Sequence, residues 1–318
     1  MSFSAADTPD LKDKVIVVTG GNAGLGFEMI RQLAQHNPTR IYLASRSAEK
    51  GNAAIQEINK SIPNAAPISL LTLDLSSFES IKAAAKTFRE RETRLDILVN
   101  NAGIMMTPEG LTKEGYEIQF GTNHMGHAFL THLLLPVLRE TTKISSEVRV
   151  VSVSSATEAR APGDIYKFDE FKTTMSNRGT TVRYGISKIA NLHYSSALAQ
   201  HYPEVKFIAV HPGMVVTDLH RNSTGFLLRL FLHAAVPFGT PVEKGVLNQL
   251  WAAVSQDAEN GGFYAPVASP WTPSKNGRNT ELRDQLYDWT QEEIGKYFET
   301  TFPRTLDVSE NNSEADGS

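Results

Sequence analysis

Short apolar runs alternate with segments of helical periodicity along most of this chain, and this alternation constrains its fold more than any other feature. The β-branched run Val15–Thr19 ends in glycines, and apolar residues then recur at helical spacing over 27–35. Runs this apolar are typical of parallel strands that are covered on both faces. The sequence therefore predicts a single-domain, Rossmann-type α/β fold: one doubly wound parallel sheet with helices on both faces. Further strands are expected at 40–44, 68–73, 95–99, 148–153 and 205–210, and further helices at 49–59, 78–91, 113–139 and 184–201.

The chain divides into one large domain and two short ends. Its 318 residues, of which 41% are hydrophobic, can bury one large core. We expect a flexible N-terminus over 1–13, a catalytic domain over 14–302 and a disordered acidic tail over 303–318. Inside the domain the alternation of strand and helix patterns is interrupted over 156–183. This stretch contains proline and glycine and predicts an insertion of loop and short helix.

Composition excludes several classes of protein. The net charge of −4 and the scattered Lys and Arg argue against a nucleic-acid surface. Because the chain has no cysteine, disulfides, thiolate chemistry and Cys-ligated zinc are excluded. The polar N-terminus does not resemble a signal peptide, and the apolar stretch 225–239 is shorter than the ~20 residues that span a bilayer, so we expect a cytoplasmic protein without an integral membrane segment.

Three histidines on the helix expected over 113–139 invite a metal interpretation. His127 and His132 follow His124 at offsets of three and eight residues, which do not form a tight helical face, and the chain has no H-E-x-x-H motif. We therefore expect no metal and assign these side chains to packing or to the helix surface.

A glycine-rich turn follows the first expected strand. It reads Thr19-Gly20-Gly21-Asn22-Ala23-Gly24-Leu25-Gly26 and opens the first expected helix. Backbone N–H groups at such a helix start bind the pyrophosphate of a dinucleotide, and glycines let the backbone approach the phosphates. The expected cofactor contacts here are Thr19, Gly20, Asn22, Gly24, Leu25 and Gly26.

The end of the second expected strand indicates which dinucleotide binds. An enzyme that selects NAD usually places an acidic residue there, but this chain reads Ala44-Ser45-Arg46-Ser47. No carboxylate would repel a 2′-phosphate, and the guanidinium of Arg46 can pair with one. The sequence therefore predicts NADP(H), held by Ser45 and Arg46. The alternative is a solvated Arg46 that only opens the next helix.

Tyr184 and Lys188 stand one helical turn apart in the helix expected over 184–201. Hydride transfer to a carbonyl needs a proton donor, and a tyrosine can serve if a nearby cation lowers its pKa. Tyr202 and Lys206 have the same spacing, but Pro203 and the strand that follows separate them. Tyr184 and Lys188 are therefore the expected pair.

These motifs resemble the short-chain dehydrogenase/reductase family, whose glycine-rich turn reads T-G-x-x-x-G-x-G, and the resemblance covers about 14–302. Within the family the chain looks most like the branch of retinol dehydrogenases, WW-domain oxidoreductases and protochlorophyllide reductases, including fungal relatives. The grounds are the run from Tyr42 to Arg46 followed by Glu49-Lys50-Gly51, and the long separation of 29 residues between Ser155 and Tyr184.

The resemblance implies a catalytic tetrad of Asn123, Ser155, Tyr184 and Lys188, in which Asn123 holds a water of the proton relay. Ser155 corresponds to the serine that polarises the carbonyl, and Ser154 is its rival.

The resemblance also implies the rest of the cofactor site. Asp74 corresponds to the adenine contact, with Leu75 beside it, and Asn101-Ala102-Gly103 corresponds to the segment next to the adenine ribose. The segment 211–217 resembles the one that contacts the nicotinamide carboxamide. Its expected contacts are Pro212, Gly213, Val215 and Thr217.

The apolar segment 226–238 follows these nicotinamide contacts. It is more apolar than a lone solvated helix, so it either completes the core or forms a lid over the substrate within 222–240. A lid is favoured because open α/β sheets bind ligands beyond the carboxyl ends of their strands. The expected substrate contacts are Met105, Thr157, Met214, Phe226, Leu227 and Phe231.

The motifs and the resemblance together predict an NADP(H)-dependent oxidoreductase. It would transfer hydride between nicotinamide and an alcohol or carbonyl on a fairly apolar small molecule, such as an intermediate of secondary metabolism. Reduction of a carbon–carbon double bond and a non-catalytic NADP-binding sensor are the alternatives. The substrate and the direction stay open. A monomer and a homodimer are both compatible, because many family members dimerise through the Asn123 and Tyr184 helices, and the 156–183 insertion can cover that surface.

Overall fold

The fold was obtained as a computed structural model that describes residues 3–215 and 240–298. Among these residues, eight strands form one sheet in the order β3-β2-β1-β4-β5-β6-β7-β8. Neighbouring strands from β3 to β7 are parallel, and β8 pairs antiparallel with β7 at the edge. The predicted fold class is confirmed. The strands are β1 Val15–Thr19, β2 Arg40–Ser45, β3 Ile68–Thr72, β4 Ile97–Asn100, β5 Arg149–Val153, β6 Lys206–Val210, β7 Phe263–Ala265 and β8 Ser269–Pro270.

Alternation of side chains along each strand produces two cores. In β1, Val15 and Val17 join the core on one face of the sheet, and Ile16 and Val18 join the core on the other. Because helices cover both faces, nearly every position of a central strand is apolar.

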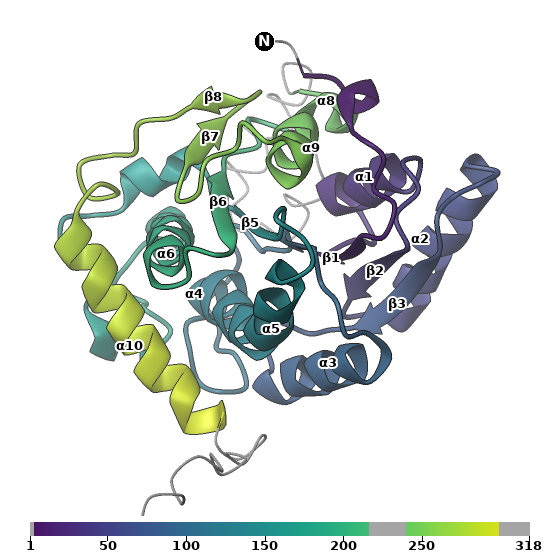
Figure 1. The fold of residues 1–318 in the computed structure, drawn as a ribbon. Coiled ribbons are helices and arrows are strands. Elements are labelled where there is room, and N and C mark those ends of the chain that lie inside the picture. Colours follow the sequence, from purple (N-terminus) through teal and green to yellow (C-terminus); the bar gives the residue numbers. More distant parts are fainter. Residues whose placement is uncertain (1–2, 216–239, 299–318) are drawn as a thin grey trace, which may run out of the picture.

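Two helical layers enclose the sheet (Figure 1). Apolar residues of α3, α5, α6 and α10 pack in one core, and those of α1, α2 and α9 pack in the other. The helices are α1 Gly24–Leu33, α2 Ala48–Ser61, α3 Phe78–Arg91, α4 Ile118–Phe120, α5 Gly126–Thr142, α6 Thr180–His201, α8 Val242–Gly245, α9 Leu247–Val254 and α10 Thr280–Phe298. Short 3-10 turns lie at Ala5–Asp7, Ala156–Arg160 and Phe168–Lys172, and a π-helical turn lies at Gly121–Met125.

The helix expected over 113–139 begins later and ends later than predicted. Leu111 and Glu117 form an isolated antiparallel bridge, and Gly115 between them has a left-handed φ of +84°, which an α-helix does not tolerate. The helix therefore starts at Ile118 as α4, passes through the π-helical turn and continues as α5 to Thr142. The carboxylate of Glu117 caps its start by accepting the Phe120 N–H at 2.7 Å.

Other element boundaries moved by a few residues. Helix α6 begins at Thr180 rather than Tyr184, inside the stretch 156–183 that was expected to be an insertion. Helix α1 begins at Gly24 rather than residue 27, so the last glycines of the turn belong to its first turn. Strand β4 begins two residues later than expected, at Ile97.

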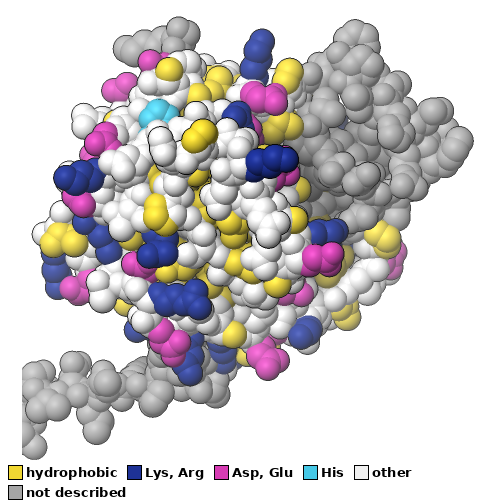
Figure 2. Space-filling model, turned by 90° about the vertical axis from the view of Figure 1, so that its right-hand side faces the viewer, with side chains coloured by type: hydrophobic (Ala, Val, Ile, Leu, Met, Phe, Trp, Pro, Cys, Tyr) yellow, Lys and Arg dark blue, Asp and Glu magenta, His cyan; other side chains and the backbone are white. Residues whose placement is uncertain are grey.

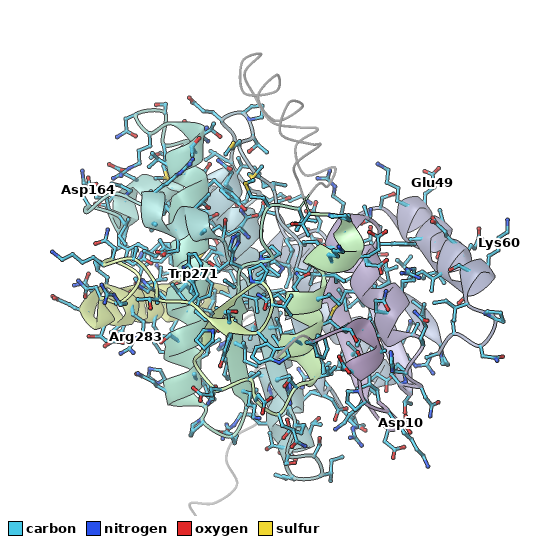
Figure 3. The ribbon with its side chains drawn as sticks, turned by 90° about the horizontal axis from the view of Figure 1, so that it is seen from above. Asp10, Glu49, Lys60, Asp164, Trp271 and Arg283 are labelled. Carbon is cyan, nitrogen blue, oxygen red and sulfur yellow. The ribbon has the colours of Figure 1, made fainter. Side chains whose placement is uncertain are left out.

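The C-terminal helix α10 lies against α6 and α5 (Figure 1). The hydroxyl of Thr290 on α10 lies 3.1 Å from His124 Nε2, and the phenol of Tyr116 donates to Glu293 at 2.6 Å. Seen from above (Figure 3), Arg283 on α10 lies on the opposite side of the molecule from Glu49 and Lys60 on α2. This helix, which packs on the outer side of α5 and α6, was not among the elements expected from the sequence.

Charged side chains of both signs are interspersed over the face shown in Figure 2. Within the described ranges, no helix has the length and the apolar composition that crossing a membrane requires. The same ranges contain no group of three or more His, Asp or Glu side chains that could hold a metal ion.

Candidate active site

Several predicted site residues lie at the carboxyl ends of β1, β4, β5 and β6, which are neighbours in the sheet. Thr19 is the last residue of β1, Asn101 follows β4, Ser155 follows β5 and Pro212 follows β6. Open α/β sheets bind their ligands at this edge. The topology therefore brings segments that are far apart in the sequence to one place.

The glycine-rich turn has a backbone that only glycine supports. Gly20 and Gly24 have left-handed φ angles of +67° and +54°, and a Cβ on Gly26 would lie 2.3 Å from the Gly20 carbonyl oxygen. Helix α1 begins at Gly24, and no side chain of the described residues caps its first N–H groups. These N–H groups are left for an anion, so the turn fits the pyrophosphate of a dinucleotide.

The end of β2 lies against this turn. The Ser45 hydroxyl donates to Asn22 Oδ1 at 3.0 Å, which joins two of the predicted cofactor residues. The next residue, Arg46, is exposed and forms no ion pair with another described residue. Its guanidinium is therefore accessible to a ligand phosphate.

The residues expected around the adenosine are held by local hydrogen bonds. The carboxylate of Asp74 accepts the backbone N–H and the hydroxyl of Ser76, at 3.0 and 2.7 Å. The neighbouring Leu75 packs tightly on α5, since a Cβ on Gly126 would lie 2.4 Å from the Leu75 carbonyl oxygen. The side chain of Asn101 donates to the Thr19 carbonyl at 2.8 Å.

Tyr184 and Lys188 share one face of α6, as their spacing predicts, and Ser155 lies at the end of β5 beside them, as the family resemblance implies. The Lys188 ammonium nitrogen lies 5.6 Å from the centroid of the Tyr184 ring and donates to the Val153 carbonyl at 2.9 Å. The hydroxyl of Ser155 interacts with the Tyr184 phenol and opposes the rise in pKa that burial causes. The rival Ser154 is buried, and its hydroxyl donates to the Lys188 backbone carbonyl at 2.7 Å. This hydroxyl proton is therefore already used in a structural hydrogen bond.

Burial controls the protonation of this pair. Burial raises the pKa of Tyr184, and the hydrogen bond with Ser155 opposes this rise. Burial lowers the pKa of Lys188 to about 8. At neutral pH the phenol of Tyr184 is therefore protonated and can donate its proton.

Asn123 lies in the π-helical turn and fixes the loop after β4. Its Oδ1 accepts the Ile104 N–H at 2.8 Å, and its Nδ2 donates to the Ile104 carbonyl at 2.9 Å and to Ser187 Oγ at 3.0 Å. The loop passes close to the site, because a Cβ on Gly103 would lie 3.2 Å from Asn123 Oδ1 and 3.6 Å from Lys188 Nζ. Asn123 thus connects the helix of the π-turn to the loop and to α6.

Gln119 connects the same loop to the first turn of α6. Its Oε1 accepts the Met106 N–H at 2.7 Å, and its Nε2 donates to the carbonyl and the hydroxyl of Thr180, both at 3.2 Å. Met106 has a left-handed φ of +52°, which is strained for a residue with a Cβ and persists only where neighbours hold it. Nothing in the sequence pattern pointed to Gln119.

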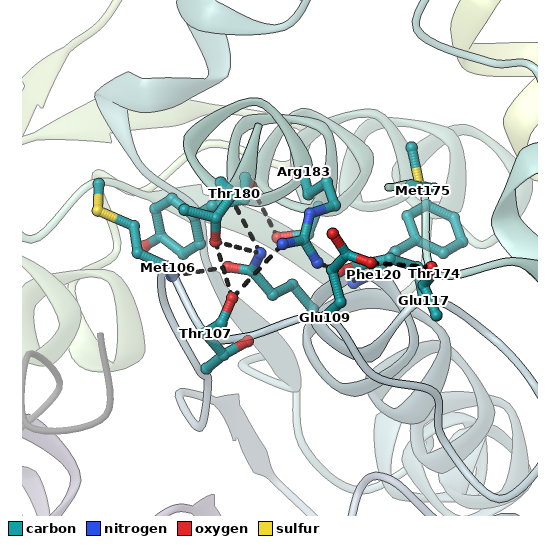
Figure 4. Close-up of polar contacts among 12 residues, drawn as sticks. Met106, Thr107, Glu109, Glu117, Phe120, Thr174, Met175, Thr180 and Arg183 are labelled. Atoms are coloured by element: carbon teal, nitrogen blue, oxygen red, sulfur yellow. Dashed lines mark hydrogen bonds and ion pairs between the residues drawn. The ribbon is translucent and has the colours of Figure 1, made fainter. Parts of the chain in front are cut away.

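A buried ion pair continues this network (Figure 4). Arg183, which precedes Tyr184 directly, donates to Glu117 Oε1 at 2.8 Å, and both side chains are at least 96% buried. A second nitrogen of Arg183 reaches the Thr107 carbonyl at 3.5 Å. The pair therefore ties the start of α4 and the loop after β4 to the turn that carries Tyr184.

The described substrate residues differ in their exposure. Met105 is buried in a cluster with Met106 and Tyr184, and the Thr157 hydroxyl is buried without a hydrogen-bond partner among the described residues. Met214, by contrast, is 72% exposed. Thr217, Phe226, Leu227, Phe231 and the predicted lid over 222–240, apart from Thr240, lie outside the described residues.

The remaining nicotinamide contacts expected after β6 form a bent segment. Gly213 has a left-handed φ of +88°, and Val215 packs so closely on α8 that a Cβ on Gly245 would lie 2.4 Å from it. Tyr202 and Lys206, which have the same spacing as Tyr184 and Lys188, lie on different elements as expected: Tyr202 caps the end of α6, and Lys206 begins β6.

The sheet order, the glycine-rich turn and the helix that carries Tyr184 and Lys188 define an α/β oxidoreductase.

Comparison with known proteins shows to which family of oxidoreductases the chain belongs. A family model described as short chain dehydrogenase matches residues 14–166. The short-chain dehydrogenase/reductase drtF of Aspergillus calidoustus is 36% identical over 304 residues, covering 91% of this chain and 96% of the relative. Retinol dehydrogenase 12 of Mus musculus is 37% identical over 290 residues, covering 90% of this chain and 88% of the relative.

The chain belongs to the short-chain dehydrogenase/reductase family, so its resemblance to that family is confirmed. A solved structure of NADPH-bound carbonyl reductase from chicken fatty liver is 22% identical and superposes with a TM-score of 0.61, covering 82% of this chain and 100% of that chain. At this identity the likeness shows the shared fold. The family binds a nicotinamide cofactor.

Proposed function

We propose that this protein is an NADP(H)-dependent oxidoreductase that interconverts a carbonyl and an alcohol on a fairly apolar small molecule. The observation that carries this proposal is the buried Tyr184 phenol, which interacts with the Ser155 hydroxyl and has the Lys188 ammonium 5.6 Å from its ring centroid. A phenol that is oriented by a hydroxyl and lies beside a cation can give its proton to the oxygen of a reduced carbonyl.

The nicotinamide, when bound, supplies or accepts the hydride. The chain's own residues hold and orient it: the free N–H groups of the Gly24 turn would bind the pyrophosphate, and Ser45 and Arg46 the 2′-phosphate. The other proposed cofactor contacts are Thr19, Asp74, Leu75, Asn101, Ala102, Gly103, Tyr184, Lys188, Pro212, Gly213, Val215 and Thr217, the last of which lies outside the described residues.

Reduction is the proposed direction. Because burial raises the pKa of Tyr184, its phenol carries a proton at neutral pH, and carbonyl reduction consumes that proton. Oxidation of an alcohol would instead require the phenolate, which burial disfavours.

An apolar substrate is supported by the side chains that surround the phenol. Met105 and Met106 are packed with Tyr184, and the buried Thr157 hydroxyl has no partner among the described residues. A polar group on a largely apolar substrate would satisfy that hydroxyl. The mouse relative is named for retinol, an apolar alcohol of this kind.

The test is NADPH oxidation by purified protein with a panel of apolar aldehydes, ketones and enones. Tyr184→Phe should lower kcat at least ~100-fold and keep the NADPH dissociation constant within about twofold. Tyr202→Phe is the matched control, since Tyr202 has the same spacing to a lysine but lies at the end of α6, and it should keep full activity.

Two outcomes would replace the proposal. A saturated ketone formed from an enone would assign reduction of the carbon–carbon double bond. If the protein binds NADPH but turns over no substrate in the panel, the alternative of a non-catalytic NADP-binding sensor is favoured.

A further inference from the structure

His127 differs from the other two histidines that the sequence assigned to packing. His124 and His132 hydrogen-bond α10, through Thr290 and Gln291 respectively. His127 is 4% exposed and hydrogen-bonds two residues of the candidate site instead. Its Nδ1 lies 2.9 Å from the Asn123 carbonyl oxygen, and its Nε2 lies 2.9 Å from the Thr19 hydroxyl oxygen.

These two contacts determine the tautomer of His127. A carbonyl oxygen can only accept, so Nδ1 must carry the proton that is donated to Asn123. Burial lowers the pKa of His127 to about 4, and the nearby Lys188 contributes to this, so the ring is neutral. Nε2 therefore has a free lone pair and accepts the hydroxyl proton of Thr19.

The Thr19 hydroxyl is in turn the acceptor for the loop after β4. It accepts the backbone N–H groups of Asn101 at 3.0 Å and Ala102 at 2.9 Å. A competing acceptor for its own proton, the Val99 carbonyl, is farther away, at 3.3 Å. With its proton directed to His127, the Thr19 hydroxyl has both lone pairs available for the two amides.

We propose that His127 is a positioning residue that couples the cofactor site to the proton-transfer site. Through Nε2 it orients the Thr19 hydroxyl, which holds Asn101 and Ala102 beside the glycine-rich turn. Through Nδ1 it holds the backbone of Asn123, whose side chain fixes the Ile104 loop and α6. This inference rests on the proposed function, because it assigns the two ends of His127 to NADP(H) binding and to proton transfer.

Two substitutions test the roles of the two imidazole nitrogens separately. In His127→Asn, the amide reaches the position of Nδ1 and can still donate to Asn123, but the acceptor for Thr19 is lost. In His127→Gln, the amide reaches the position of Nε2 and can still accept from Thr19, but the donor to Asn123 is lost.

The two variants should therefore show opposite kinetic defects. His127→Asn should weaken NADPH binding about 3- to 10-fold, as expected for one lost hydrogen bond, and keep kcat at saturating NADPH within about twofold. His127→Gln should keep the NADPH dissociation constant within about twofold and lower kcat about 3- to 10-fold.

Amide hydrogen exchange of the protein without cofactor provides a readout that does not depend on turnover. Asn101 and Ala102 should exchange faster in His127→Asn than in wild type, and at the wild-type rate in His127→Gln. His132→Asn is the matched control: it removes a partly buried histidine from the same helix α5, so it should lower Tm and leave NADPH affinity and these exchange rates unchanged. If His127→Asn does not fold, Thr19→Val removes the same hydroxyl contact and should reproduce its defect, while Thr19→Ser should not.

The inference is wrong if both His127 variants behave like the His132→Asn control, or if both lower kcat and NADPH affinity alike. The inference is also wrong if none of these substitutions changes the amide hydrogen-exchange rates of Asn101 and Ala102. Failure of the wild-type protein to bind NADPH would instead refute the proposed function, and the exchange experiment would still decide whether His127 positions the loop.

Discussion

Removal of the buried cation Arg183 should cause a large, pH-dependent loss of stability. Arg183 and Glu117 lie 2.8 Å apart, with side-chain exposures of 4% and 0%. Arg183→Met keeps an apolar stem of similar length and deletes the charge. The Glu117 carboxylate would then be buried with backbone N–H groups, including that of Phe120, as its described partners.

The expected cost follows from the charge that remains. Breaking a buried ion pair by removing one partner costs about 3–5 kcal/mol, because the other charge stays desolvated. The additional contact of Arg183 with the Thr107 carbonyl is long, at 3.5 Å, and contributes little. The double substitution Arg183→Met with Glu117→Gln should recover part of the loss, because no unpaired charge is left.

The pH dependence has a definite sign. Burial raises the pKa of Glu117 above its ordinary value of 4.5, while the Phe120 N–H and Arg183 oppose the rise. Without Arg183 the pKa of Glu117 in the folded state rises further above its value in the unfolded chain. Between these two pKa values the folded variant binds more protons than the unfolded chain. The stability of the variant therefore falls as the pH rises through this range. The deficit relative to wild type should be largest near about pH 8 and shrink toward about pH 5.

Urea unfolding followed by tryptophan fluorescence, at both pH values, measures this deficit. Lys86→Met is the matched control, because it removes the cation of an exposed pair with Glu90, with 72% and 62% exposure, and should cost less than about 1 kcal/mol. A deficit for Arg183→Met below about 1 kcal/mol at neutral pH, or one that grows on acidification, would refute the reasoning.

Three further predictions concern the cofactor, the proton donor and the oligomeric state. Arg46→Ala should weaken NADPH binding about tenfold more than NADH binding, and Ser45→Asp should reverse the preference; equal weakening of both cofactors in a fluorescence titration would remove the 2′-phosphate assignment. Lys188→Ala should lower kcat and move its pH optimum upward, because the phenolate loses its cation; an unchanged pH profile would exclude that role. Because α10 lies against α5 and α6, light scattering should show a monomer of about the chain mass, 35.0 kDa, whereas twice that mass would indicate a dimer through another surface.

Local features of the sequence were sufficient for the framework of this protein. Continuously apolar runs such as Val15–Thr19 reflect burial on both faces of the sheet, so they predicted the parallel sheet and its helical layers. The glycine-rich turn could be recognised because positive φ at Gly20 and Gly24 is a requirement of the backbone itself. The helical spacing of Tyr184 and Lys188 likewise depends on neighbours within one turn.

Tertiary structure decided what depends on contacts between distant segments. His127 and Thr19 are 108 residues apart, and Arg183 and Glu117 are 66 apart, so no local pattern relates them. Ser154 and Ser155 are alike in sequence, and only the packing of β5 on α6 directs one hydroxyl to the Lys188 backbone and the other to Tyr184. The start of α4 depends on the bridge at Glu117 and on the left-handed Gly115 before it rather than on helix propensity. Burial makes these polar contacts obligatory, and burial is a property of the assembled fold.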